Sequence, residues 1–137
     1  MKVSLKVEYA CRVLAQLARH NGSGEWPHIE ALATQEEIPA NYLVQILNDL
    51  RNSGLIQSRR GKQGGYALAR ENDQVTLCDI ICAIDGGLLE FNTEVKGQSG
   101  ARLVELWAQV TAELEKMTRG ITLEDMITSS HEGMYFI

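Results

Sequence analysis

The chain has 137 residues, is 45% hydrophobic and carries a formal net charge of −5. This length fits one ordinary domain, or one domain with an appendage, that can bury a core. No apolar run approaches the ~18 residues that a membrane span needs, so we expect a cytoplasmic protein without a membrane segment. Three cysteines in a sequence without an export signal argue against a disulfide framework.

The charge is divided unequally between the two halves of the chain. Residues 1–70 hold nine Lys and Arg against six Asp and Glu, whereas residues 71–137 hold four against twelve. Between 39 and 70 the only acidic residue is Asp49, among five basic ones. A local basic footprint is typical of a surface that binds nucleic acid, although a solvated charged surface would have the same composition.

Two helices joined by a short turn are predicted in the first third of the chain, after an initial helix that Ser4 caps and that ends near His20. The first of the two lies within 28–35 and the second spans about 39–53, where Gly54 supplies a stop. The pattern indicates a helix-turn-helix.

A β-hairpin is predicted directly after the second of these helices, over about 55–69. Two short strand-like runs flank the sequence RRGKQGG, which is suited to a tight, basic tip. A helix-turn-helix followed by a hairpin is the order of a winged helix, so we expect a mainly α fold with one small hairpin. A nucleotide-binding P-loop is a poor alternative, because the loop lacks the required Lys-Ser/Thr ending and the following helix.

The winged-helix order predicts which residues contact DNA. The second helix enters the major groove, while the hairpin tip follows the backbone or the minor groove. On the helix, the polar side chains outside the apolar stripe are Asn41, Tyr42, Gln45, Asn48 and Arg51. In the hairpin we expect Arg59, Arg60 and Lys62 near phosphates, and Gly64 and Gly65 to supply positive φ angles and a close approach to the duplex.

The second half of the chain predicts a short helix, a loop and a long helix. Thr76 and Asp79 cap the short helix, whose expected buried stripe is Leu77, Ile80, Ile81 and Ile84. The long helix spans about 101–118 and has a heptad seam, which calls for a partner helix, although packing on its own domain is an alternative. The seam consists of Leu103, Trp107, Val110, Leu114 and Met117.

A capped short helix beginning after Thr122, with Asp125 as its partner, completes the predicted elements. The tail MYFI is too apolar to be left in solvent, so we expect it to dock on the dimer or to receive a partner protein. We expect residues 1–85 to form the DNA-binding domain and residues 86–137 to form the loop, the dimerisation helix, the short helix and the tail.

The opening MKVSLKVEYA, the helix NYLVQILNDLRNSGLI, the hairpin SRRGKQGGYALA and the later ITLEDM together resemble the Rrf2 family of bacterial winged-helix transcription regulators. The resemblance covers nearly the whole chain and implies a homodimer on a partly palindromic operator, with the long helix as its interface. It adds Lys6 to the expected DNA contacts. One position departs from the family: Val44 stands where members often have Glu. Unlike Glu, Val cannot accept a hydrogen bond from cytosine.

The cysteines depart from the family's cluster-binding members, which carry three of them in the loop before the long helix. Here the loop 86–101 has none, and the thiols lie at Cys11, Cys78 and Cys82. Cys78 and Cys82 are one helical turn apart, but two thiolates are not the four that an iron–sulfur cluster usually needs. Three scattered histidines lack ligand spacing. We therefore expect no metal site and no cofactor, and structural roles for the cysteines.

The prediction is a sequence-specific DNA-binding transcriptional regulator, a repressor, closest in character to the cluster-free branch that controls cysteine metabolism. A protein partner or a small molecule would modulate its affinity for DNA. No set of nucleophile, base and acid indicates an enzyme. Two alternatives stay open: a winged-helix protein-interaction module without DNA binding, and a thiol-based redox-sensing regulator that uses Cys11, Cys78 or Cys82.

Overall fold

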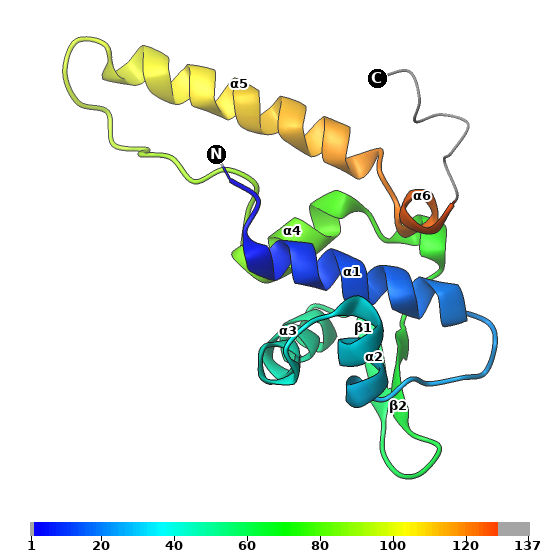
Figure 1. Cartoon of the computed structure of the whole chain (residues 1–137). Helices are drawn as coiled ribbons and strands as arrows, with labels where there is room; N and C mark the ends of the chain where they lie inside the picture. The colour runs from blue at the N-terminus through cyan, green and yellow to red at the C-terminus, as the bar shows by residue number, and fades with distance from the viewer. Residues whose placement is uncertain (1, 129–137) are drawn as a thin grey trace.

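Three helices and a two-stranded hairpin follow one another in the first half of the chain, as the sequence predicts (Figure 1). The computed structural model describes residues 2–128, so the tail MYFI lies outside the described residues. The elements are α1 (Leu5–His20), α2 (Ile29–Glu36), α3 (Ala40–Asn52), β1 (Ile56–Arg59) and β2 (Gly65–Leu68).

The ends of these helices have local causes. The Ser4 hydroxyl accepts a hydrogen bond from the Val7 amide at 3.1 Å and caps α1, as predicted. Pro39 precedes the first residue of α3, where its missing N–H costs the helix nothing. Gly54, with φ of 79°, turns the chain out of α3 into the hairpin.

The second half of the chain contains a 3-10 turn and three more helices. They are η1 (Asn72–Gln74), α4 (Leu77–Asp85), α5 (Gly100–Arg119) and α6 (Leu123–Ile127). Both predicted capping boxes are confirmed: Thr76 with Asp79 at α4, and Thr122 with Asp125 at α6. Each satisfies two backbone N–H groups that the first helical turn leaves unpaired.

The core lies between α1, α2, α3, the hairpin and α4, and α6 completes it from the far end of the chain. Leu123 is fully buried within it. Next to α6, Leu123 N–H donates to the Val75 carbonyl at 3.0 Å and Leu77 N–H donates to the Ile121 carbonyl at 2.8 Å. The predicted domain boundary after residue 85 would therefore place α6 in a different domain from α1 and η1, against which it packs.

The predicted buried stripe of α4 is only partly right. Ile80 is fully buried, but Leu77, Ile81 and Ile84 are half-buried, while Cys78 takes a buried position. Leu77 and Ile81 instead line an apolar groove whose other walls include Val7 of α1 and Leu114 of α5. This stripe faces the junction with α5 as well as the core.

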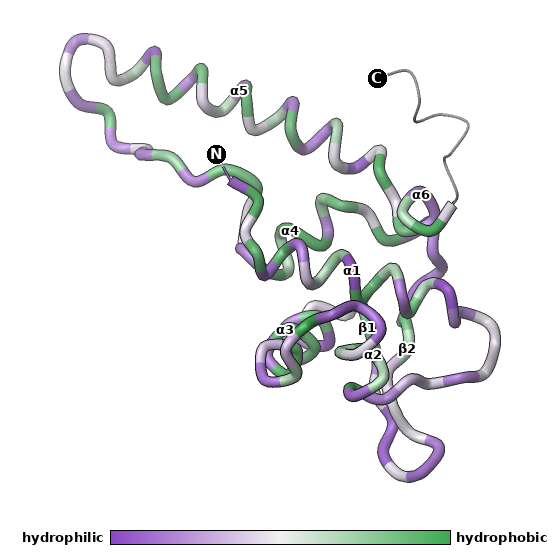
Figure 2. Tube along the Cα trace, viewed as in Figure 1, coloured by the Kyte–Doolittle hydropathy of each residue, from purple (hydrophilic) through white to green (hydrophobic). Residues whose placement is uncertain are grey.

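The helix α5 packs against α4 near its C-terminal end and extends away from the rest of the molecule toward its N-terminal end (Figures 1 and 2). Hydrophobic and hydrophilic residues alternate along it in Figure 2. Within residues 2–128, no helix combines the length and apolar character that a membrane crossing requires.

Candidate nucleic-acid interface

The outer face of α3 is lined by exposed side chains, and its inner face is buried in the core. Leu43, Ile46, Leu47 and Leu50 are buried and fix the rotation of the helix about its axis. On the opposite side lie Asn41, Tyr42, Val44 and Gln45, all of them exposed. Tyr42 and Val44 are exposed to 59% and 51%, which is unusual for their size and leaves them free for a partner.

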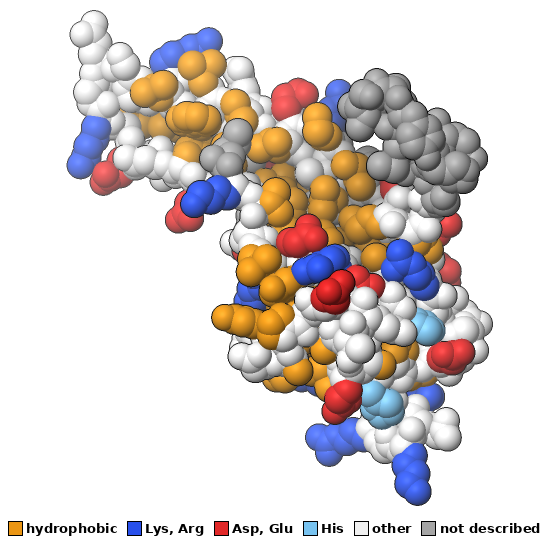
Figure 3. All heavy atoms as spheres, viewed as in Figure 1, with side chains coloured by type: hydrophobic (Ala, Val, Ile, Leu, Met, Phe, Trp, Pro, Cys, Tyr) orange, Lys and Arg blue, Asp and Glu red, His pale blue; other side chains and the backbone are white. Residues whose placement is uncertain are grey.

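The hairpin holds its basic tip clear of the core. In the register, Ile56 pairs with Leu68 at the core end and Arg59 pairs with Gly65 at the tip end. The Tyr66 amide donates to the Pro27 carbonyl at 2.9 Å, which ties β2 to the segment before α2. Lys and Arg side chains project around the end of this hairpin (Figure 3). We call residues 55–69 the wing.

Arg59 folds back on the wing instead of extending from it. Its Nε and Nη2 donate to the Gln63 carbonyl at 3.1 and 2.7 Å. Its guanidinium lies 4.3 Å from the centroid of the Trp26 ring, a cation–π contact. Arg59 therefore braces the tip, whereas Arg60 and Lys62 are exposed and have no ion pair among the described residues.

Gly64 and Gly65 are both required by contacts within the chain. A Cβ at Gly64 would stand 2.1 Å from the Arg59 carbonyl oxygen, and one at Gly65 would stand 2.0 Å from that of Trp26. The predicted positive φ is right for Gly65, at 143°, and wrong for Gly64; the second positive φ at the tip belongs to Gly61, at 93°. Both predicted glycines are buried by the chain's own backbone.

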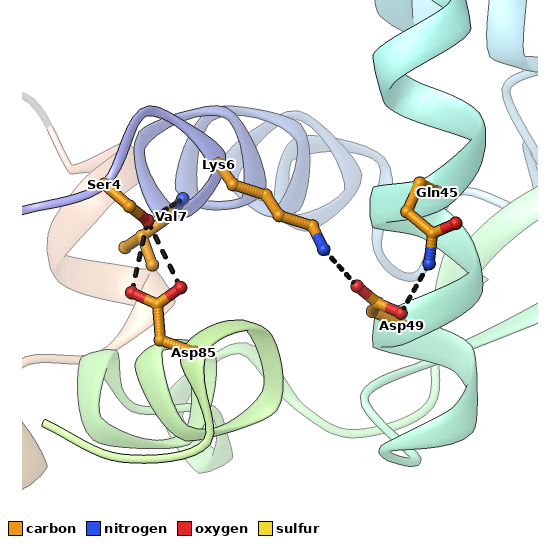
Figure 4. Close-up of polar contacts among 6 residues, drawn as sticks. All are labelled: Ser4, Lys6, Val7, Gln45, Asp49 and Asp85. Atoms are coloured by element: carbon orange, nitrogen blue, oxygen red, sulfur yellow. Dashed lines mark hydrogen bonds and ion pairs between the residues drawn. The ribbon is translucent and has the colours of Figure 1, made fainter. Parts of the chain in front are cut away.

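An ion pair joins α1 to the outer face of α3 (Figure 4). Lys6 Nζ lies 2.6 Å from Asp49 Oδ2, and Gln45 Nε2 donates to Asp49 Oδ1 at 3.0 Å. The hydrogen bond from Lys6 lowers the pKa of the Asp49 carboxyl, with a smaller contribution from Gln45, so this carboxylate is ionised at neutral pH. The sequence had indicated Lys6 and Gln45 but not Asp49, whose only signal was its isolation among basic residues.

Arg51 connects α3 to the wing. Its Nη1 donates to the Ser58 hydroxyl at 3.3 Å and its Nη2 donates to the Asn48 side-chain oxygen at 3.2 Å. Guanidinium groups have five donors, so Arg51 keeps others for an anion. Arg51, a predicted DNA contact, thus joins the two predicted contact surfaces through Ser58, which was not predicted.

The seam of α5 is largely uncovered in the single chain. Leu103, Trp107 and Met117 are exposed to 51%, 41% and 67%, and Val110 and Leu114 are half-buried. Leu106, exposed to 37%, belongs to the same face and was missed by the strict heptad spacing. Figure 3 shows the hydrophobic side chains gathered along this helix. An apolar stripe of this length is typical of a surface that another protein covers.

Cys11 and Cys82 have environments unlike those of redox sensors, in which a lowered pKa creates the reactive thiolate. Burial, followed by the nearby Glu8 carboxylate, raises the pKa of Cys11 to about 11. Burial also raises the pKa of Cys82, with further contributions from the Cys78 thiol and acidic neighbours. Cys82 is nonetheless exposed, whereas Cys78 is buried and Cys11 is half-buried.

The donor set does not fit an iron–sulfur cluster. The loop 86–99 supplies no thiolate, and the cysteines of the chain lie on α1 and α4. Among the described residues, no group of three or more His, Cys, Asp and Glu side chains is placed to hold a metal ion.

A helix-turn-helix whose exposed face stands beside a basic hairpin defines the class of winged-helix DNA-binding proteins. Comparison with known proteins agrees. Residues 3–129 match the model of the Rrf2 family, described as iron-dependent transcriptional regulators. The chain belongs to this family and is a DNA-binding transcriptional regulator, as the resemblance implied.

Two relatives, CymR and IscR, illustrate the similarity. The transcriptional regulator CymR of Bacillus subtilis is 32% identical over 126 residues, which cover 92% of this chain and 89% of CymR. The solved structure of B. subtilis CymR, described as the global cysteine regulator, has a TM-score of 0.78 at 30% identity and covers 93% and 96% of the two chains. The structure of IscR of T. potens has a TM-score of 0.75 at 34% identity, covering 98% and 91%. CymR fits the predicted branch.

Proposed function

We propose that the protein is a repressor that binds a partly palindromic operator as a homodimer. Each subunit would place α3 in the major groove and the tip of its wing in the adjacent minor groove. The observation that carries this proposal is the exposed polar face of α3, which packs beside a wing whose Arg60 and Lys62 are exposed and have no ion pair within residues 2–128. Base contacts from a helix and phosphate contacts from a basic loop are complementary sources of specificity and affinity.

The contacting residues divide into two roles. Asn41, Tyr42 and Gln45 face outward and suit base edges, while Arg60 and Lys62 suit phosphates. Three of the predicted contact residues already use donors within the chain: Lys6 bonds to Asp49, Arg51 to Ser58, and Arg59 to the Gln63 carbonyl. Their first role is therefore to position the two surfaces. Gly64 and Gly65 shape the wing.

The homodimer follows from the seam of α5. Two copies of the stripe would bury side chains that a single chain leaves in water, and the gain is roughly 25 cal/mol per Å² of apolar surface removed. A dimer also gives a palindromic site its second half, since two-fold symmetric proteins match two-fold symmetric operators.

Regulation would proceed without an iron–sulfur cluster, through a protein partner or a small molecule. The support is the donor set, which lacks loop thiolates, and the raised pKa values of Cys11 and Cys82. Anaerobic reconstitution with iron and sulfide tests this: a stoichiometric visible chromophore would contradict it.

The DNA-binding role is tested by a salt titration of duplex binding. Log affinity should fall steeply and linearly with log salt, and Arg60→Ala should reduce the slope by about one unit, because one phosphate contact releases about one counterion. Lys96→Ala is the matched control, since Lys96 is an exposed cation in the loop before α5, paired with Glu94.

A shallow slope in the wild-type protein would instead favour the protein-interaction module. A normal slope that Arg60→Ala leaves unchanged would remove the wing tip from the interface without removing DNA binding.

A further inference from the structure

Asp49 is an acidic residue in an unexpected place. It lies on α3 one turn beyond Gln45 and two turns beyond Asn41, on the side of the helix that faces the proposed duplex. A bare carboxylate there would repel phosphates. In this structure each of its oxygens has a donor, Lys6 on Oδ2 and Gln45 on Oδ1 (Figure 4).

The chemistry of this contact fixes the orientation of the Gln45 amide. An ionised carboxylate only accepts hydrogen bonds, so the end of the amide that meets it has to be the NH₂ group. The carbonyl oxygen Oε1 is then the end directed away from Asp49, and it has no partner among the described residues. Without Asp49, the amide could turn over and present either end to a base.

We propose that Asp49 is a specificity-determining positioning residue, which holds Gln45 so that its carbonyl oxygen selects bases with an exocyclic amine in the major groove. This inference rests on the proposed DNA-binding role of α3. Adenine offers N6–H₂ and cytosine offers N4–H₂ in that groove, whereas the polar atoms of guanine and thymine there are acceptors only. At most one N–H of the held amide is left, in a fixed direction beside the oxygen.

Lys6 has a distinct part in this arrangement. It neutralises Asp49 from α1, so the carboxylate can orient Gln45 without carrying an uncompensated negative charge toward the phosphate backbone. Because the pair links two helices, it also fixes the direction from which the carboxylate approaches the amide.

The test is selection of sites from a pool of randomised DNA duplexes by the whole protein, followed by competition among four duplexes that differ at one base pair. At one position of each half-site, the wild type should prefer adenine and cytosine over guanine and thymine by about tenfold, the discrimination of one base contact. Asp49→Ala should reduce this preference to about twofold or less. Asp49→Glu, which keeps an acceptor-only group, should retain most of it.

Two further variants separate orientation from direct contact. Gln45→Ala should abolish the preference, and adding Asp49→Ala to it should change nothing more, because Asp49 acts through Gln45. Asp73→Ala removes the same charge from η1, which packs against α6, and should leave the base preference as in the wild type.

Four results would overturn the inference or the DNA-binding role on which it rests. Equal weakening by Asp49→Ala on all four duplexes would mean a structural role only. Persistence of the preference in Gln45→Ala, with loss on addition of Asp49→Ala, would mean that Asp49 contacts the base itself. A selected site whose base preference Asp49→Ala leaves unaltered would overturn the positioning role of Asp49 while leaving DNA binding intact. A wild-type protein that enriches no site and shows no steep salt dependence would overturn the DNA-binding role itself.

Discussion

Gly65 shows how a single residue sets the position of the wing. Its φ of 143° lies in a region that side chains rarely adopt, and its Cα faces the backbone of Trp26 at a distance that leaves no space for a Cβ. The close approach of the two chain segments is what allows the Tyr66 amide to reach the Pro27 carbonyl. The wing is therefore anchored by backbone contact as well as by its strands.

We predict that Gly65→Ala destabilises the protein by roughly 1–3 kcal/mol or more, the cost of a strained backbone residue plus the displacement of Trp26. Urea unfolding followed by circular dichroism measures it. Gly87→Ala is the matched control, because a Cβ there meets nothing within 4 Å and φ is not positive. Equal effects of the two substitutions would contradict this account of the wing.

At the same scale, the environments of Cys11 and Cys82 predict different reactivities for their thiols. The thiolate is the nucleophile, so a pKa raised to about 11 leaves only roughly one part in a thousand of Cys11 ionised near about pH 8. Cys82 also has a raised pKa but is exposed, whereas Cys11 is half-buried.

We predict that an alkylating reagent modifies Cys82 before Cys11 in the folded protein, and that the rate at Cys11 rises steadily with pH toward about 11. Mass spectrometry of time points gives the order of modification. In denaturant the two sites should react at similar rates. Fast modification of folded Cys11 at neutral pH would revive the redox-sensing alternative.

At the scale of elements, α4 lies between the winged-helix elements and α5, and its start is well defined. The Thr76 hydroxyl accepts from the Asp79 amide at 3.1 Å, and the Asp79 carboxylate accepts from the Thr76 amide at 2.9 Å. At its other end, the Ser4 hydroxyl, at the start of α1, donates to the Asp85 carboxylate at 3.2 Å (Figure 4). The start of α4 is thus capped by its own residues, and its end is tied to the start of α1.

We predict that Thr76→Ala lowers the free energy of unfolding by about 1 kcal/mol, since an N-cap hydroxyl is lost. Thr76→Ser retains the hydroxyl and should recover most of the difference. Chemical denaturation of the three proteins measures the effect. A loss of the same size in Thr76→Ser would assign it to the methyl group and not to the cap.

At the scale of the whole molecule, the exposed stripe of α5 is the surface on which the proposed homodimer depends. We predict that the wild type sediments at twice the 15.2 kDa of one chain and that Trp107→Glu shifts it to the monomer, because a charge in an apolar interface has no partner. Ala112→Glu introduces the same charge on an exposed part of α5 outside the stripe and should remain dimeric.

The two variants also distinguish assembly from folding. Trp107→Glu should keep the helical circular dichroism spectrum of the winged-helix core while binding a full operator more weakly than a dimer does. A dimeric Trp107→Glu would place the interface elsewhere.

Much of this molecule could be predicted from the sequence because its signals are local. Helix caps such as Ser4, Thr76 and Thr122 and the glycine stop after α3 depend on a few neighbouring residues. Asp49 was missed because its importance depends on a contact with Lys6, 43 residues away along the chain. The wrong φ at Gly64 has a different origin, since glycine is required there by the close approach of the Arg59 carbonyl within the same tight tip and not by a positive φ.

The burial of Leu123 also has a consequence for how the protein is made. The chain emerges from the ribosome in order, so α1 to α4 exist well before the residue that closes their core. Until α6 arrives, the nascent winged helix has an open apolar site on α1, and the whole of α5 is synthesised in the interval. The apolar core of the winged helix is therefore closed only after the whole of α5 has been made.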